Sequence, residues 1–201
     1  YALVSYHTAW LKANHPVEFM AASMTLDLGN TDKLGDFRQE ARRMRIEVMP
    51  PSINRSMVHF DVDEGRIVYA MGAIKGVGEQ AVQHIVDARG DRPFRNLSDF
   101  ASRISPKFLN KRTLESLVNA GAFDCIEPNR ARVFEGLDRI MGLAQRTESN
   151  ATLGQNDMFG GAGVEEELRL PEVNGWLPAE RLQREHAAIG FYLSSHPLDE
   201  Y

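Results

Sequence analysis

The chain is poor in cysteine and has no long apolar run, and both absences limit what it can be. Cys125 is the only cysteine among the 201 residues, so no disulfide can form within the chain. This suits a reducing compartment, and we expect a cytoplasmic protein with Cys125 buried beside Phe123 and Ile126. No apolar run approaches the ~20 residues that cross a bilayer, which excludes a membrane-spanning helix. Because no leader-like segment follows Tyr1, we expect both ends to be boundaries inside a longer protein.

Metal and nucleotide motifs are also missing. The six histidines and the single cysteine show none of the spacings that bind zinc, and no Walker-type glycine loop is present. The only Asp-x-Asp is Asp61-Val62-Asp63, whose carboxylates would share one face of a strand. It runs directly into a turn expected at Glu64-Gly65, so we do not assign it to a metal. We therefore assign this chain no metal site and no cofactor.

The charges that are present are unevenly distributed. Apolar residues (43%) and charged residues (25%) occur in ordinary proportions, and the net charge is −5. Residues 66–112 nevertheless carry nine lysines and arginines against four acids, whereas residues 147–201 carry ten acids against three basic residues. This asymmetry is expected if the middle of the chain contacts phosphate and the tail does not, although a solvated surface produces the same split.

Apolar periodicity predicts a mostly α-helical fold with one small β-hairpin. Residues 1–28 are expected to be helical, with Pro16 at the start of a second helix. A third helix is expected over 32–45, capped by Asn30 or Thr31 and stopped by Pro50-Pro51. The other predicted elements are a β-hairpin around Asp63-Glu64-Gly65-Arg66, helices over 73–145, a flexible glycine-rich linker and a last helix over 178–188.

The most informative segment is centred on Gly76 and Gly78. The two glycines flank an apolar residue and leave a tight turn with no side chain over it. The amides of such a turn open a helix, where free N–H groups and the helix dipole favour an anion such as phosphate. The residues that we expect to bind DNA here are Lys75, Gly76, Val77, Gly78 and Glu79.

This spacing, with Ala81 three residues after the second glycine, resembles the helix-hairpin-helix motif. Contacts of this kind address the backbone, so binding should be largely independent of sequence and should fall steeply with salt. A simple tight turn between two helices is the alternative.

A second unit of the same kind is expected further along the chain. Leu97 and Phe100 belong to a short helix, and another helix begins at Asn110 and ends near Gly121. Basic side chains at a helix start oppose the dipole, which is easier to explain if phosphate binds there than if the turn is merely solvated. In this unit we assign DNA binding to Asn110, Lys111 and Arg112.

Further blocks extend the pattern over the whole chain. They are Tyr1-Ala2-Leu3-Val4-Ser5-Tyr6, Trp10-Leu11-Lys12, Pro16-Val17-Glu18-Phe19-Met20, Pro50-Pro51-Ser52-Ile53-Asn54, Gly72-Ala73-Ile74-Lys75-Gly76-Val77-Gly78, Gly121-Ala122-Phe123-Asp124 and His196-Pro197-Leu198. In this order they resemble blocks of the α subunit of the bacterial C-family DNA polymerases, polymerase III. The resemblance implies part of the fingers domain over 1–57, a β-hairpin and tandem helix-hairpin-helix DNA-binding domain over 58–146, a flexible linker over 147–175, and over 176–201 a helix that leads toward an oligonucleotide-binding domain.

The resemblance also implies an activity for the parent protein. The family are DNA-directed DNA polymerases, nucleotidyltransferases that use Mg²⁺ held by three aspartates of a palm domain. That block is missing here, so we expect this piece to be inactive alone. The implied partners are double-stranded primer–template DNA, the sliding clamp and the other subunits of the replicative holoenzyme, without a membrane.

Within the expected linker, Gln155-Asn156-Asp157-Met158-Phe159 resembles the pentapeptide by which this family binds the sliding clamp. Gln155 would form hydrogen bonds at the rim of a pocket that Met158 and Phe159 fill, and we assign Asp157 to the same site. The alternative is that the two large apolar side chains fold back on the domain.

Two other functions remain open from the sequence. One is a helix-hairpin-helix module of a repair ligase or excision nuclease, which would lack the fingers blocks before the hairpin. The other is a protein-interaction scaffold that binds the clamp without binding DNA. Arg38, Arg42 and Arg43 are candidates for steering triphosphate or template, but a solvated helix face explains them equally well.

Overall fold

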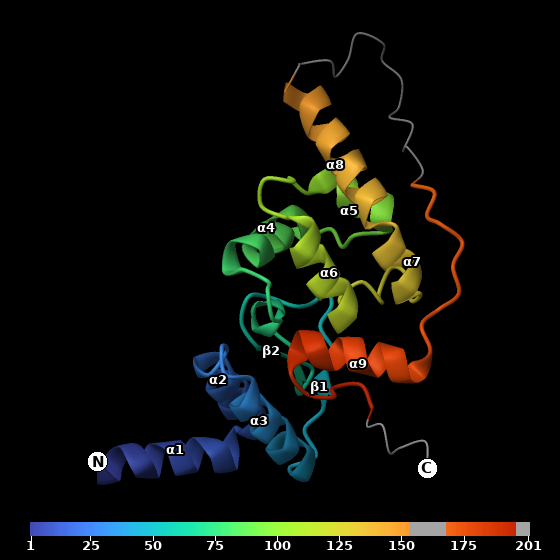
Figure 1. The fold of residues 1–201 in the computed structure, drawn as a ribbon. Helices are drawn as coiled ribbons and strands as arrows, with labels where there is room; N and C mark the ends of the chain where they lie inside the picture. Colours follow the sequence, from blue (N-terminus) through green and yellow to red (C-terminus); the bar gives the residue numbers. More distant parts are fainter. Residues whose placement is uncertain (153–167, 196–201) are drawn as a thin grey trace.

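The computed structural model describes residues 1–152 and 168–195, with side chains over 1–150 and 168–195. In Figure 1 the first three helices lie at one end, a small sheet and the last helix lie in the middle, and the other helices form the other end. The predicted fold, mostly α-helical with one small β element, is confirmed. The described elements are α1 (Ala2–Asn14), α2 (Pro16–Leu26), α3 (Thr31–Arg43), β1 (Val48–Met49), β2 (Asp61–Asp63), β3 (Arg66–Val68), the 3-10 turn η1 (Met71–Ala73), α4 (Glu79–Arg89), α5 (Leu97–Arg103), α6 (Lys111–Ala120), α7 (Arg130–Glu135), α8 (Leu137–Thr152) and α9 (Pro178–Ile189).

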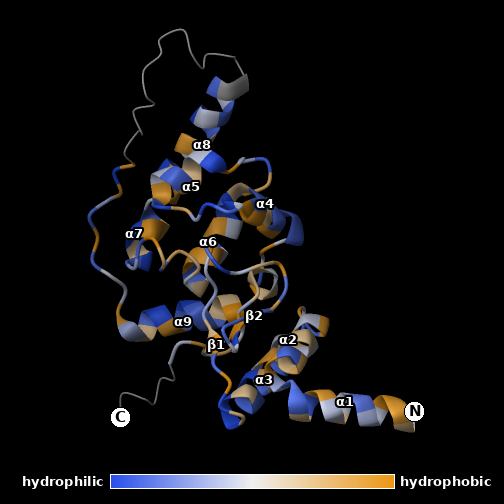
Figure 2. Cartoon of the chain, turned by 180° about the vertical axis from the view of Figure 1, so that it is seen from behind, coloured by the Kyte–Doolittle hydropathy of each residue, from blue (hydrophilic) through white to orange (hydrophobic). Residues whose placement is uncertain are grey.

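The first three helices follow from local signals. Pro16 occupies the first turn of α2, where its missing N–H costs nothing, and Asn30 caps α3 by accepting the N–H of Lys33. The helix α2 buries Met20 and Met24, whereas α1 has no buried residue. Figure 2 shows apolar residues at the N-terminal end of α1, which projects from the rest of the chain.

The end of α3 differs from the prediction. The helix stops at Arg43, well before Pro50-Pro51, and Arg45 has a φ of +60°. The N–H of Ile46 then donates to the carbonyl of Ala41 (2.8 Å), which closes the helix and directs the chain into β1. A left-handed residue, not the proline pair, therefore ends this helix.

The predicted hairpin is confirmed and gains a third strand. Strands β2 and β3 pair antiparallel, with Val62 opposite Ile67, and the turn between them uses positive φ at Glu64 (49°) and Gly65 (74°). Strand β1 pairs parallel to β3 on its other edge, giving the order β1-β3-β2. The short β1 was not predicted, because two residues give no alternating pattern.

Helices α4 to α8 enclose an aromatic core. The ring of Phe100 packs edge-on against the rings of Phe94 and Phe123, with centroids 5.1 Å and 5.0 Å apart. All three side chains are buried. Gly121 ends α6 in the left-handed conformation (φ 86°), as predicted. Cys125, which follows in the turn after α6, is exposed, so the expectation that it is buried is wrong.

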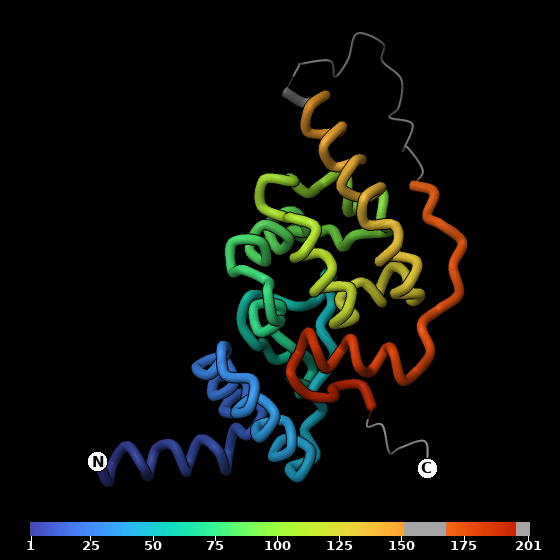
Figure 3. Tube along the Cα trace, in the orientation of Figure 1, coloured from blue at the N-terminus to red at the C-terminus, as the bar shows by residue number. Residues whose placement is uncertain are grey.

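The last described segments return to this core. Helix α8 lies along α5 and continues to Thr152, into the range where we expected the linker to begin. Residues 168–177 then run past α7, and α9 crosses beneath α6 (Figure 3). The predicted last helix is confirmed. In the two described stretches no helix combines the length and apolar character that crossing a membrane requires.

Candidate nucleic-acid interface

The bend that precedes α4 lies on the surface of the molecule. Gly76 has a φ of +78°, a left-handed conformation that favours glycine. Val77 is buried and anchors the bend, whereas Gly76, Gly78 and Glu79 are exposed, as is Lys75. The element before the bend is a 3-10 turn and not a full α-helix. A large polyanion can therefore reach this bend without any rearrangement of the chain.

One of the amides at the bend is already used within the chain. The N–H of Val77 donates to the carbonyl of Ile74 (3.1 Å), so it is not available to a phosphate. The amides of Gly78, Glu79 and Gln80 have no acceptor within the described part of the chain. These three N–H groups lie at the beginning of α4 and point out of its N-terminal end. The helix dipole favours an anion there.

The uncapped start of α4 contrasts with the starts of four other helices. Asn30, Asn96, Asn110 and Asn129 cap α3, α5, α6 and α7, each with a side-chain oxygen that accepts an N–H of the first turn. Helix α4 begins after Gly78, which has no side chain and makes no capping bond. A capping side chain at this position would occupy the donors that an external phosphate needs.

The bend rests on the end of α9, a contact that the sequence did not predict. The N–H of Lys75 donates to the carbonyl of Ala188 (2.9 Å). Gly190 ends α9 with a φ of +102°, and a Cβ at this position would lie 2.7 Å from the Cβ of Thr31. The end of α9 therefore packs between α3 and the bend and holds the bend in place.

The beginning of α6 leaves fewer polar groups open to a ligand than the beginning of α4. Asn110 is its N-cap and accepts the N–H of Thr113 (2.9 Å). Lys111 forms an ion pair with Asp138 (2.8 Å), and the hydrogen bond between them raises the pKa of Lys111 above its ordinary value. Arg112 is exposed and has no ion pair within the described residues, so it is the cation of this turn that is open to a phosphate.

His84 holds the two helix starts in a fixed relation. Its Nε2 accepts the N–H of Ser105 (2.7 Å), and its ring stacks on Phe108 (4.8 Å between centroids), so the loop before α6 is fastened to α4. Burial lowers the pKa of His84, and the charges of Asp87 and Glu148 only partly offset this. The neutral imidazole that accepts the bond is thereby favoured. Figure 1 shows the beginnings of α4 and α6 on the same side of the molecule, away from α7.

Part of the positive charge counted over residues 66–112 is structural. Arg89 is buried and donates to the carbonyls of Ile53 and Ser56, and Arg103 donates to the carbonyls at the end of α4. Arg103 also pairs with the buried Asp99 (3.3 Å). Neither arginine can meet a phosphate, so the sequence count overstates the charge of the interface.

The acidic pair on β2 does not fit a two-metal site. Asp61 and Asp63 are exposed, and Asp63 lies 3.6 Å from the guanidinium of Arg55. Within the described ranges no group of three or more potential metal-ligating residues comes together. Two carboxylates on a short strand, one of them facing an arginine, cannot replace a palm site.

The remaining predicted residues fall in two places. Arg43 pairs with Glu40 (3.7 Å), whereas Arg38 and Arg42 line a depression beside β1. The clamp-binding residues lie outside the part of the chain that the structure describes; they are Gln155, Asp157, Met158 and Phe159.

Comparison with known proteins agrees with this geometry. The helix-hairpin-helix motif family matches residues 45–133, which contain the bend, α4, α5 and α6. The match assigns a helix-hairpin-helix motif to this part of the chain, as the glycine spacing predicted.

The relatives identify the family more closely. The chain is 47% identical to the DNA polymerase III subunit alpha of Caulobacter vibrioides, 44% identical to that of Vibrio cholerae and 42% identical to that of Escherichia coli. Each match covers 100% of this chain and 18% of the relative. The chain is homologous over its whole length to one segment of the DNA polymerase III α subunits, so the predicted resemblance is confirmed. A repair-protein module would not account for the match before the hairpin.

Proposed function

We propose that this chain binds the phosphate backbone of double-stranded DNA through the bend before α4 and the beginning of α6. The observation that carries the proposal is the exposed start of α4, where the amides of Gly78, Glu79 and Gln80 have no acceptor within the described residues. Free N–H groups at a helix start bind phosphate and do not distinguish bases. Binding is therefore independent of sequence.

Two exposed cations support the same surface. Lys75 lies within the bend, and Arg112 lies in the first turn of α6. Lys111 contributes less, because it shares its charge with Asp138. The hydrogen bond from the N–H of Ser105 to His84 joins α4 to the loop before α6, so both turns belong to one packed unit.

The parent protein extends this role. The chain spans 18% of the length of its relatives, which carry the name DNA polymerase III subunit alpha. We infer that the parent is a DNA-directed DNA polymerase of the bacterial cytoplasm that works with the other subunits of the replicative holoenzyme. Bound Mg²⁺ aligns the reacting groups in such enzymes, and aspartates outside this chain hold it. This segment positions product duplex and is inactive alone.

We also infer a contact with the sliding clamp through Gln155, Met158 and Phe159. The described segments on either side of 153–167 are both held on the domain: α8 packs along α5, and the N–H of Leu168 donates to Oγ of Ser98 (2.9 Å). Both ends are therefore attached to the domain that carries the bend. Such tethering raises the effective concentration of the motif at a clamp on the same DNA.

Duplex binding measured against salt tests the main proposal. Between about 50 and 200 mM salt, log affinity should fall linearly with log salt, by about 0.9 per phosphate contact. Arg112→Ala should reduce this slope by about 1 for unrelated sequences alike, because it removes a backbone contact. Arg43→Ala, which removes an exposed arginine paired with Glu40, should leave the slope unchanged. Salt-independent affinity, or equal effects of the two variants, would refute the assignment.

The clamp contact has its own test. Replacing Met158 and Phe159 together with alanine should lower capture by immobilised clamp at least about tenfold, because buried apolar anchors dominate small interfaces. Asn156→Ala should have little effect. Duplex affinity should stay unchanged in both variants. Undiminished capture would remove the motif, and clamp capture by a chain that fails to bind duplex would favour the scaffold alternative.

A further inference from the structure

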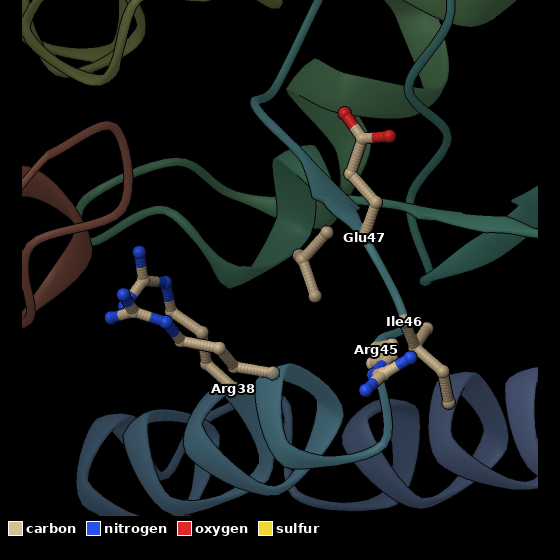
Figure 4. Close-up of a pocket in the computed structure, with 6 residues that line it drawn as sticks. Arg38, Arg45, Ile46 and Glu47 are labelled. Carbon is tan, nitrogen blue, oxygen red and sulfur yellow. The ribbon is translucent and has the colours of Figure 1, made fainter.

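A second positively charged site lies away from the bend, where α3 meets β1. It is a depression of about 280 Å³ that three arginines line. Figure 4 shows Arg38 on α3 and Arg45 just beyond the end of this helix, with the carboxylate of Glu47 directed away from both. The full lining is Arg38, Arg42, Arg45, Ile46, Glu47 and Val48.

The arginines of this region differ in their contacts. Arg38 and Arg42 are four residues apart on α3, where like charges repel. Arg38 donates to the carbonyl of Leu193 (2.7 Å), which fixes its guanidinium at the edge of the depression. Arg42 and Arg45 are exposed and have no ion pair within the described residues, whereas Arg43, on the same helix, pairs with Glu40 (3.7 Å).

Arg45 carries a conformational cost. Its φ of +60° places it in the left-handed position that ends α3, where the N–H of Ile46 reaches the carbonyl of Ala41. Glycine is the usual residue at this position, because a Cβ disfavours the conformation. The helix dipole favours a cation here but does not require this particular position. Strained residues cluster at active sites and ligand clamps, so this conformation points to a role for the Arg45 side chain.

We propose that this depression binds phosphate groups, independently of the bend before α4. A guanidinium offers paired N–H donors in a plane that match two phosphate oxygens, and it keeps its charge at all working pH values. The hydrogen bond to the carbonyl of Leu193 orients the guanidinium of Arg38. The side chains of Arg42 and Arg45 contact the same bound phosphate. The phosphate belongs either to a nucleic-acid strand or to a free nucleoside triphosphate.

Two substitutions separate ligand binding from folding. Arg45→Gly removes the side chain and relieves the left-handed backbone, so the melting temperature should stay the same or rise. Affinity for phosphate should nevertheless fall about tenfold, as the loss of a charge-assisted hydrogen bond predicts. Arg42→Ala should have a similar effect on binding. Arg43→Ala is the matched control and should change affinity less than about twofold, as expected of an arginine outside the site.

The experiment is carried out with the 201-residue chain by calorimetry and anisotropy. The probes are inorganic tripolyphosphate, a deoxynucleoside triphosphate and a labelled single-stranded oligonucleotide. Selective loss of oligonucleotide binding identifies a strand phosphate, and selective loss of tripolyphosphate and nucleotide binding identifies a triphosphate; both support the proposal. The same titrations are repeated with Gly78→Asp, which changes the bend before α4. This distinguishes binding at the depression from binding at the helix-hairpin-helix bend. Equal losses in Arg42→Ala and Arg43→Ala, or no loss in Arg45→Gly, would overturn the proposal.

Discussion

Gly78→Asp is expected to lower the affinity of the chain for duplex DNA by a factor of at least ~10, without destabilising the fold. Gly78 has a φ of −78°, and no atom lies within 4 Å of the Cβ that a substitution would add. An aspartate there can therefore cap α4, and capping residues stabilise a helix start relative to glycine by a few tenths of a kcal/mol. The same carboxylate occupies the donors that phosphate needs and repels the phosphate charge.

The opposite signs of these two effects make the test decisive. Urea unfolding should give an unchanged or slightly higher free energy of unfolding, while anisotropy shows the loss of duplex binding. Gly78→Asn separates the effect of occupying the α4 amides from the effect of added charge. Its side chain caps α4 without repelling phosphate, so it should weaken duplex binding less. Gly29→Asp adds the same charge at another position with no atom within 4 Å of its Cβ and should bind almost normally. Tight duplex binding by Gly78→Asp would show that the α4 amides do not contact phosphate.

Local chemistry made the bend predictable from the sequence. Gly76 and Gly78 specify a side-chain-free turn, and the asparagines before α3 and α6 specify helix starts. Each of these signals acts over a few residues, so it can be recognised without knowing the fold. The hairpin turn at Glu64-Gly65 was predictable for the same reason.

The parts that the sequence did not reveal depend on distant pairs. Arg89 contributes to a charge count, but its carbonyl partners are those of Ile53 and Ser56, far from it in sequence. Lys111 was expected to face phosphate, yet its partner is Asp138 on α8. The contact between α9 and the bend likewise joins distant residues, because the N–H of Lys75 donates to the carbonyl of Ala188. Only the packed structure distinguishes such structural cations from those that are open to a ligand.

The attachment of α9 depends on a buried ion-pair network centred on Arg130. Its guanidinium binds Asp124 (2.8 Å) and Glu185 of α9 (3.3 Å), and the side chain is only 4% exposed. Burial alone would lower the pKa of Arg130, but the hydrogen bonds and charges of Asp124 and Glu185 raise it above its ordinary value. The other carboxylate oxygen of Glu185 accepts the amides of Leu193 and Ser194, so the network also orders the chain after α9.

Arg130→Ala is therefore expected to cost about 3–5 kcal/mol of the free energy of unfolding, because it leaves Glu185 buried without its cation. Urea unfolding measures this cost. Arg132→Ala is the matched control: its guanidinium pairs with Glu127 (3.3 Å) and its side chain is 40% exposed, so the expected cost is about 0–1 kcal/mol. Replacing Arg130 with methionine and Glu185 with glutamine should recover much of the loss, since no buried charge is left unpaired and the glutamine oxygen can still accept the N–H groups of Leu193 and Ser194. Equal costs for Arg130→Ala and Arg132→Ala would mean that the network does not hold α9. Because α9 supports the bend at Lys75, Arg130→Ala should also weaken duplex binding, and the double replacement should restore it.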